Sequence, residues 1–392
     1  MIKKAKRLDQ VSEYYFSRKL EQIASMRACG KEVINLGIGS PDMVPEASVI
    51  SSLKEAASHK DNHAYQPYRS TTELREAIGH YYRQLYNVVL DPRKEVLPLL
   101  GSKEGIMYVS LAFLNPGDEV LVPNPGYPAY AACARLVGAR VRHYDLLEET
   151  SWTPDFNGLR KMNLTSVKLM WVNYPNMPTG ATVELKLFES LVSFAYENDI
   201  LLCNDNPYSQ VLNDSPLSLL SADPEKRRAL ELNSLSKSFN MAGWRVGMLL
   251  GHKEYIDAVI QVKSNVDSGM FRPVQVAASK ALELPQEWHT ERNATYAKRR
   301  KKGFELLDIL DCTYSDNQAG MFIWAKVSPV VGNTHEFIDR LLNEAQIFIT
   351  PGDIFGTKGR GYIRISLCAS NDLYDRAIER VKTWEKRKKQ LV

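Results

Sequence analysis

Lys237 is the residue of this sequence best placed for chemistry. It lies in the segment SLSKS, between small hydroxyl side chains, directly after the apolar run 232–235 and before a Gly-rich turn. The apolar run predicts a strand, and a lysine next to a buried strand is poorly placed to serve solubility. The pattern therefore indicates an amine that acts as a nucleophile or moves a proton.

A serine enzyme is one alternative for the same segment. Ser234 and Lys237 fit the Ser-x-x-Lys motif of β-lactamases and penicillin-binding proteins, and the run 315–317, Ser-Asp-Asn, matches their second element. The third element, Lys-Thr-Gly, is absent from the sequence. The serine of that motif opens a helix, whereas Ser234 belongs to a predicted strand, so we do not favour a serine hydrolase.

The segment around Lys237 resembles the lysine motif of the pyridoxal-phosphate enzymes of fold type I, the aspartate aminotransferase superfamily. Further signatures similar to those of this family follow in the family's order from about Asn35 to Ala369. A site for an aldehyde on a pyridine ring with a phosphate arm needs an amine, an anion, a phosphate cradle and a support for the ring. The resemblance implies pyridoxal 5'-phosphate as the cofactor, with Lys237 as the Schiff-base lysine and the catalytic proton carrier.

Three residues resemble those that hold the cofactor ring in this family. Asp205 follows a predicted strand, 200–203, and matches the carboxylate that pairs with the pyridine nitrogen. Tyr208 matches the phenol that hydrogen-bonds the O3′ atom of the cofactor, and Tyr127 matches the aromatic ring that stacks on the pyridine. An aspartate at a strand end is by itself more often a turn or helix cap, so only the whole set supports this interpretation.

A phosphate site is indicated where the segment GSKEG, residues 101–105, follows a predicted strand and opens a helix. The free backbone N–H groups and the dipole of a helix N-terminus favour a phosphate. The resemblance implies phosphate contacts from the main-chain amides of Ser102 and Lys103 and from the side chains of Ser234, Ser236 and Arg245.

The substrate side of the site is expected around Arg364, a charged residue inside the apolar strand pattern 362–367. A buried charge is unfavourable without a partner, and the resemblance makes that partner the α-carboxylate of the substrate. Gly39 resembles the family's close backbone approach to the same carboxylate. Tyr65 resembles a tyrosine that reaches the phosphate of the neighbouring subunit's cofactor, which implies a homodimer.

Two positions depart from the family's pattern. In the segment NYPNMPTG, residues 173–180, Met177 replaces the asparagine that usually donates to O3′. That hydrogen bond is lost unless Asn173 or Asn176 supplies it, and we keep Asn176 as a candidate cofactor ligand. Ser70 stands where a glycine is usual, which we interpret as a tolerable change in a turn.

Short apolar runs alternate with helical patterns through the middle of the chain. This rhythm predicts an α/β fold in which helices cover both faces of a mostly parallel sheet. Two long helical patterns, 253–284 and 286–307, come next, and the remaining strands and helices predict a smaller α+β domain. We expect an N-terminal segment 1–45 that joins the small domain, a large cofactor domain 46–284 and a small C-terminal domain 285–392.

Composition restricts the class of protein. Hydrophobic residues make up 44% and charged residues 24% of the 392 residues, which excludes fibrous and disordered chains. A net charge of +4 is too small at this length to indicate a nucleic-acid or membrane-surface partner. No apolar run approaches a membrane span or signal peptide, and the five cysteines suggest neither a metal site nor a disulfide framework. We expect a cytoplasmic enzyme without a metal.

The reaction follows from the resemblance in part. The implied cofactor serves transamination, elimination, racemisation and decarboxylation, because the protein decides which substrate bond breaks. The segments 101–105, 173–176 and 267–271 resemble the class I/II branch that includes LL-diaminopimelate aminotransferases. This implies transfer of an amino group between an L-amino acid and a 2-oxo acid through Lys237. LL-diaminopimelate is a candidate donor, and a carbon–sulfur β-lyase is the alternative reaction.

The substrate's side chain stays open. Lys103 and Glu104 could read the distal charges of a diaminopimelate, and Arg69 or Arg272 could read a dicarboxylate; ordinary surface charges explain all four equally well. A catalytically idle, cofactor-binding regulator is a third hypothesis. It would carry a DNA-binding domain, and we expect the segment before Asn35 to be too short for one.

Overall fold

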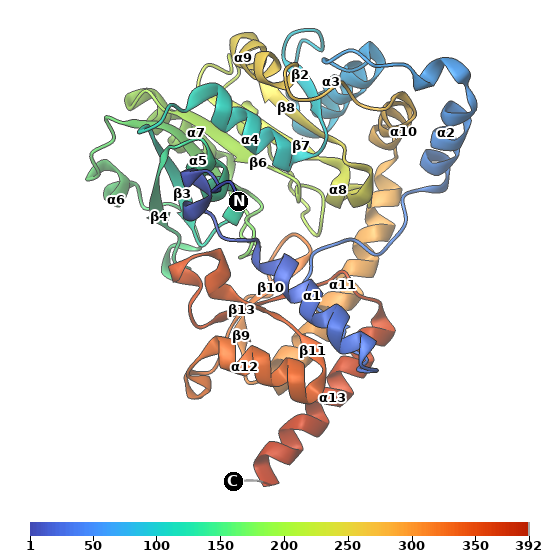
Figure 1. Ribbon diagram of the computed structural model, residues 1–392, viewed down its shortest axis with the longest axis vertical. Helices are drawn as coiled ribbons and strands as arrows, with labels where there is room; N and C mark the ends of the chain where they lie inside the picture. The colour runs from blue at the N-terminus through green and yellow to red at the C-terminus, as the bar shows by residue number, and fades with distance from the viewer. Residues whose placement is uncertain (391–392) are drawn as a thin grey trace.

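The computed structural model describes residues 1–390, and its larger part is built on a seven-stranded sheet in the order β2-β8-β7-β6-β5-β3-β4 (Figure 1). Only β8 runs against its neighbours, and the other adjacent pairs are parallel. The predicted α/β fold with a mostly parallel sheet is confirmed. The strands are β2 (Val96–Leu99), β3 (Glu119–Asn124), β4 (Arg140–Asp145), β5 (Val167–Val172), β6 (Leu201–Asp205), β7 (Ala229–Ser234) and β8 (Gly247–Gly251).

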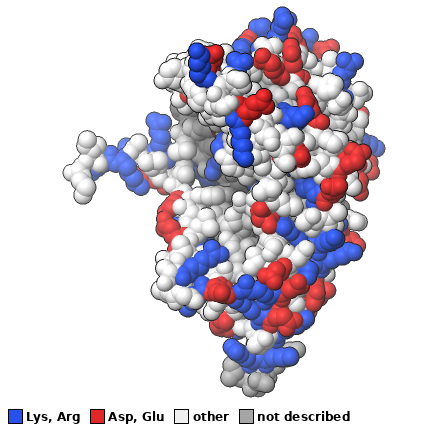
Figure 2. Space-filling model, turned by 90° about the vertical axis from the view of Figure 1, so that its right-hand side faces the viewer, with Lys and Arg blue, Asp and Glu red and all other residues white. Residues whose placement is uncertain are grey.

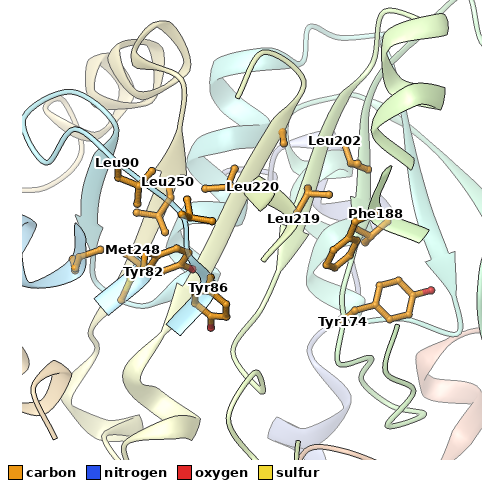
Figure 3. Packing of buried hydrophobic residues seen from close by; sticks show 14 of the residues in the cluster. Tyr82, Tyr86, Leu90, Tyr174, Phe188, Leu202, Leu219, Leu220, Met248 and Leu250 are labelled. Carbon is orange, nitrogen blue, oxygen red and sulfur yellow. The ribbon is translucent and has the colours of Figure 1, made fainter. Parts of the chain in front are cut away.

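Helices cover both faces of this sheet because successive residues of a buried strand point to opposite sides. In β5, Met170 and Val172 pack in a cluster with residues of α3, α7 and α10, part of which Figure 3 shows. Leu169 and Trp171 pack in a second cluster with residues of α4, α5 and α9. The helices are α2 (Ala47–Ser58), α3 (Thr72–Tyr86), α4 (Ser102–Phe113), α5 (Pro128–Leu136), α6 (Phe156–Arg160), α7 (Leu185–Glu197), α8 (Leu235–Ser238), α9 (Lys253–Lys263) and α10 (Arg272–Leu282).

The smaller part contains an antiparallel sheet in the order β12-β13-β10-β9 and a parallel pair of β1 with β11. Its elements are α1 (Tyr15–Ala28), β1 (Ile34–Asn35), α11 (Gln286–Ile309), β9 (Thr313–Tyr314), β10 (Phe322–Lys326), α12 (Thr334–Arg340), the π-helical turn η7 (Leu341–Ala345), β11 (Ile347–Phe348), β12 (Thr350–Pro351), β13 (Tyr362–Ser366) and α13 (Asn371–Gln390).

The two ends of the chain meet in this smaller part. Phe16, Ile23 and Leu36 share one hydrophobic cluster with Phe348 and Tyr374. In Figure 1 the blue α1 lies beside the orange and red C-terminal elements. The division of the chain at residues 45 and 284 stays a proposal.

Two of the boundaries that differ from the sequence prediction have a clear physical reason. The pattern 253–284 forms two helices, α9 and α10, because Pro273 lacks a backbone N–H and suits the first turn of a new helix. The strand predicted over 232–235 ends at Ser234, whose Oγ accepts from the N–H of Ser236 at 3.0 Å and caps α8. The capped turn carries Lys237 away from the sheet. No helix in the described part of the chain is long and apolar enough to span a bilayer.

We predict that Phe188→Ala lowers the free energy of unfolding by about 3–5 kcal/mol, measured by chemical denaturation. The side chain of Phe188 is fully buried, and its ring centroid lies 6.3 Å from that of Tyr174 (Figure 3). Val89→Ala, at a side chain that is 67% exposed, is the control and should change stability by less than about 0.5 kcal/mol. A loss below about 1 kcal/mol for Phe188→Ala would contradict tight packing of this core.

Candidate active site

A cavity of about 550 Å³ lies where the carboxyl ends of β5, β6 and β7 face the smaller part of the protein. Figure 2 shows the molecule hollowed between its upper and lower parts. Most of the residues predicted for the site line this cavity. They are Gly39, Ser102, Lys103, Tyr127, Asp205, Tyr208, Ser234, Ser236, Lys237, Arg245 and Arg364.

Lys237 presents its amine to this cavity from the short helix α8. Its Nζ donates to the backbone oxygen of Gly39 at 2.6 Å. Burial lowers the pKa of Lys237, because the charged ammonium loses its hydration there. A larger share of the amine is therefore neutral than in an exposed lysine, and neutral amines are the nucleophilic form.

Asp205 ends β6, and its carboxyl group is buried. Tyr130 donates to Oδ2 at 2.9 Å, whereas Oδ1 has no hydrogen-bond partner. Tyr130 is itself fixed by stacking on Trp171, with ring centroids 5.0 Å apart. Burial raises the pKa of Asp205 to about 7. The site thus holds an acid with one oxygen left for a further donor.

The predicted phosphate ligands gather at the N-terminus of α4. Gly101 precedes this helix with a φ of 93°, which favours glycine, and a side chain there would collide with the guanidinium of Arg245. Arg245 Nη1 donates to the Oγ of Ser236 at 3.4 Å, and the Oγ of Ser234 donates to the same oxygen at 2.8 Å. Free backbone N–H groups, two hydroxyls and a cation suit an anion in this corner.

Arg364 in β13 is 4% exposed, yet no carboxylate of the described residues pairs with it. Nη2 donates to the backbone oxygen of Gly37 at 2.9 Å, Nη1 contacts the Sδ of Met177 at 3.2 Å, and Nε has no partner. The guanidinium carbon lies 3.8 Å from the ring centroid of Phe322 and 4.6 Å from that of Phe355. Burial lowers the pKa of Arg364 to about 10, so it stays charged at neutral pH.

Two tyrosines complete the wall of the cavity. Burial raises the pKa of both Tyr127 and Tyr208, so that both phenols keep their protons at neutral pH. Tyr127 packs edge-on against Tyr130, and Tyr208 packs edge-on against Phe322. These contacts fix the two rings at the wall of the cavity.

Two predicted residues do not line the cavity. Asn176 uses its side chain inside its own turn: Oδ1 accepts from the Oγ1 of Thr179 at 2.8 Å, and Nδ2 donates to the backbone oxygen of Asn173 at 3.2 Å. Tyr65 is 91% exposed on the larger part of the protein. Met177 and Asn173 do line the cavity, so the departure at position 177 lies in the site itself. The predicted roles of Asn176 and Tyr65 stay predictions.

Sequence reasoning missed several lining residues. Tyr14, Phe16 and Leu20 come from the N-terminal segment, and the Nζ of Lys103 lies 4.7 Å from the ring centroid of Tyr14. No local spacing links this segment to the site, since its contacts are long-range. Tyr130 was accessible to prediction, because it stands three residues after Tyr127, on the same side of a helical turn.

Comparison with known proteins supports one family. Residues 31–381 match the family model described as aminotransferase class I and II. The LL-diaminopimelate aminotransferase of Dehalococcoides mccartyi is 38% identical over 382 residues, which cover 97% of this chain and 98% of the relative. The LL-diaminopimelate aminotransferase of Aquifex aeolicus is 38% identical over 388 residues, with 97% and 99% covered.

Solved structures agree with this result. Substrate-bound BacF from Bacillus subtilis has a TM-score of 0.94 and 32% identity, with 98% of each chain covered. The aspartate aminotransferase of Thermus thermophilus with maleate has a TM-score of 0.90 and 27% identity, with 97% of this chain and 99% of that chain covered. The resemblance to fold type I is therefore confirmed, and the chain belongs to the class I and II aminotransferases.

Proposed function

We propose that this aminotransferase binds pyridoxal 5′-phosphate in its cavity and uses it to exchange an amino group between an L-amino acid and a 2-oxo acid. The observation that carries the proposal is that one cavity holds both the buried amine of Lys237 and the partnerless Oδ1 of Asp205. An amine reacts with an aldehyde, and a carboxylate oxygen accepts from a protonated ring nitrogen. One cofactor satisfies both groups.

The remaining parts of the cofactor also find ligands in the cavity. The phosphate fits the corner at the N-terminus of α4, with the main-chain amides of Ser102 and Lys103 and the side chains of Ser234, Ser236 and Arg245. Tyr127 supports the ring by stacking. Tyr208 donates to O3′, and because Met177 cannot donate there, Tyr208 has a larger share of this task than in relatives with an asparagine.

The cofactor, when bound, supplies an electron sink for the negative charge that develops at the Cα of the amino acid. Asp205 holds a proton on the ring nitrogen by accepting a hydrogen bond from it. The Nζ of Lys237 takes the proton from Cα, a task suited to a base whose pKa is lowered toward neutrality. Tyr130 keeps Asp205 oriented during this exchange.

Arg364 binds the α-carboxylate of the amino acid in our proposal. Its guanidinium is held between the rings of Phe322 and Phe355, which limit its motion and keep water away. Because the buried charge has no carboxylate partner in the described chain, an entering carboxylate gains a strong charge-assisted hydrogen bond. Gly39 borders the same end of the cavity, where a side chain would collide with the ring of Phe322.

We propose a substrate with a charged distal group. Lys103 lines it, so we propose that this cation faces the distal end of the amino acid. Glu104 is engaged elsewhere, since its carboxylate accepts from the N–H of Leu100 and from the hydroxyl of Tyr108. Arg69 pairs with Asp257 outside the cavity. LL-diaminopimelate, the substrate named for relatives of this chain, is the proposed donor.

A homodimer is the proposed assembly. Apolar side chains are exposed on the larger part at Tyr65, Tyr68, Val266 and Phe271. Covering them against a second copy removes apolar surface from water and lets Tyr65 reach the phosphate corner of the partner's cavity. We also propose a cytoplasmic location, in keeping with five cysteines that are all free thiols.

We predict that Lys237→Ala abolishes the covalent pyridoxyl adduct that borohydride traps on the wild-type protein with pyridoxal phosphate. Without Nζ the cavity has no amine at this position for the aldehyde. Mass spectrometry of the intact protein measures the adduct. Lys103→Ala removes the other lysine that lines the cavity and keeps the adduct, which makes it the matched control. A wild-type protein without an adduct, or an adduct that persists in Lys237→Ala, would reject the proposal.

Asp205→Asn should change how the stability of the cofactor-free protein depends on pH. The pKa of Asp205 is raised in the folded protein to about 7, so its contribution is present at low pH and is lost as pH rises through about 7. The asparagine variant keeps its stability over this pH range, because asparagine does not titrate. Its free energy of unfolding should therefore gain about 2 kcal/mol relative to wild type between about pH 5 and about pH 8. Parallel stability profiles from denaturant titrations would refute this expectation.

Arg364→Ala should weaken binding of the amino acid about 100-fold, because truncating one member of a buried charge pair leaves the other unpaired. The visible absorbance of bound cofactor should persist, since the guanidinium has no proposed contact with it. Rapid-mixing measurement of the half-reaction against amino acid concentration gives the dissociation constant. Arg364→Lys keeps the charge without the planar fork and should lose less. An unchanged dissociation constant for Arg364→Ala would remove this residue from the carboxylate site.

A further inference from the structure

Glu231 is a buried carboxylate in the middle of β7, with no exposed surface. No lysine or arginine of the described residues pairs with it. Four donors surround it instead: the hydroxyl of Tyr82 at 2.9 Å and the Nδ2 of Asn206 at 3.4 Å on Oε1, and the Nδ2 of Asn204 at 3.0 Å and the N–H of Leu219 at 2.8 Å on Oε2. Burial raises the pKa of Glu231.

The two asparagines that donate to Glu231 are the chain neighbours of Asp205. Asn204 lies in β6, and Asn206 directly follows its end, where its N–H still donates to the backbone oxygen of Leu232 in β7 at 2.8 Å. Along this extended chain, residues 204 and 206 point to the face opposite residue 205, and β6 pairs with β7 in the register Asn204 to Glu231. The carboxylate of Glu231, on one face of the sheet, therefore accepts hydrogen bonds from both chain neighbours of Asp205, whose own side chain lies on the other face. These two bonds fix the side chains on both sides of Asp205.

Only a carboxylate can accept from all four donors. A glutamine at position 231 would offer one oxygen and one N–H₂ group, so at least one of the N–H donors would face another donor. Apolar residues would fill the same space at a lower desolvation cost. The desolvation cost of burying Glu231 therefore points to a function for this residue at the end of β6, where Asp205 lies.

We propose that Glu231 is a positioning residue for Asp205: by holding Asn204 and Asn206 it keeps the partnerless oxygen of Asp205 directed at the ring nitrogen of the cofactor. This inference rests on the proposed binding of pyridoxal phosphate. It assigns Glu231 no contact with the cofactor, since Glu231 lies on the other face of the sheet and does not line the cavity. Its effect should therefore depend on the ring nitrogen.

The test compares two ligands on the cofactor-free protein by equilibrium titration of absorbance. One is pyridoxal phosphate, and the other is its 1-deaza analogue, which has the same aldehyde and phosphate but a C–H group in place of the ring nitrogen. For Glu231→Gln we expect affinity for pyridoxal phosphate to fall about tenfold, while affinity for the analogue changes less than about twofold. A merely structural role would weaken both ligands equally.

Two further variants keep the experiment decisive. Glu95→Gln changes a half-buried carboxylate at the opposite edge of the sheet, where it pairs with Lys226, and should leave the ratio of the two affinities as in wild type. Tyr82→Phe removes one donor from Glu231. It should lower the affinity for pyridoxal phosphate relative to the affinity for the analogue, as Glu231→Gln does, but by a smaller factor. It decides the question if Glu231→Gln does not fold.

The outcomes separate this inference from the proposed function. A wild-type protein that binds no pyridoxal phosphate rejects the proposed function and the role of Glu231 with it. A wild-type protein that binds it, together with Glu231→Gln and Tyr82→Phe variants in which both ligands weaken equally or neither weakens, overturns the role of Glu231 alone. A loss confined to the ligand with a ring nitrogen supports it.

Discussion

The burial of charge at the carboxyl edge of the main sheet is the constraint on which the site depends. Asp205 ends β6 with one oxygen unpartnered, and burial raises its pKa to about 7. Glu231 lies on the next strand, with no cation beside it. A sheet selected only for stability would carry apolar residues here. The arrangement is favourable when a protonated ring nitrogen enters and gives Asp205 a donor.

The site also depends on how the two parts of the protein are joined. Lys237 in α8 and Asp205 in β6 come from the larger part, whereas Arg364 in β13 comes from the smaller part. The Nδ2 of Asn124, at the end of β3, donates to the Oγ1 of Thr357 at 2.9 Å, and the N–H of Gly126 donates to the backbone oxygen of Phe355 at 2.8 Å. These two bonds tie the larger part to the smaller one. The groups proposed to bind the cofactor and the carboxylate therefore belong to different parts of the protein, whose relative position must be fixed for the site to form.

The sequence was sufficient to predict what is local. Lys237, Asp205 and Arg364 stand in short motifs or break an apolar strand, and the alternation of strands and helices predicted the sheet. The sequence did not predict that Tyr14 lines the cavity or that Glu231 accepts a hydrogen bond from Asn204, because both depend on contacts between residues far apart in the chain. The internal use of the Asn176 side chain depends on the exact turn geometry, which a motif does not specify.

The half-reaction tests the central claim most directly. Holoenzyme is mixed with LL-diaminopimelate, and then with a cysteine conjugate, without any 2-oxo acid acceptor. The account predicts that diaminopimelate removes the visible absorbance of the cofactor, that one 2-oxo acid forms per cofactor, and that an added 2-oxo acid restores the absorbance. Steady release of pyruvate and ammonia from the cysteine conjugate, with no loss of absorbance from diaminopimelate, would contradict the account and favour a carbon–sulfur lyase.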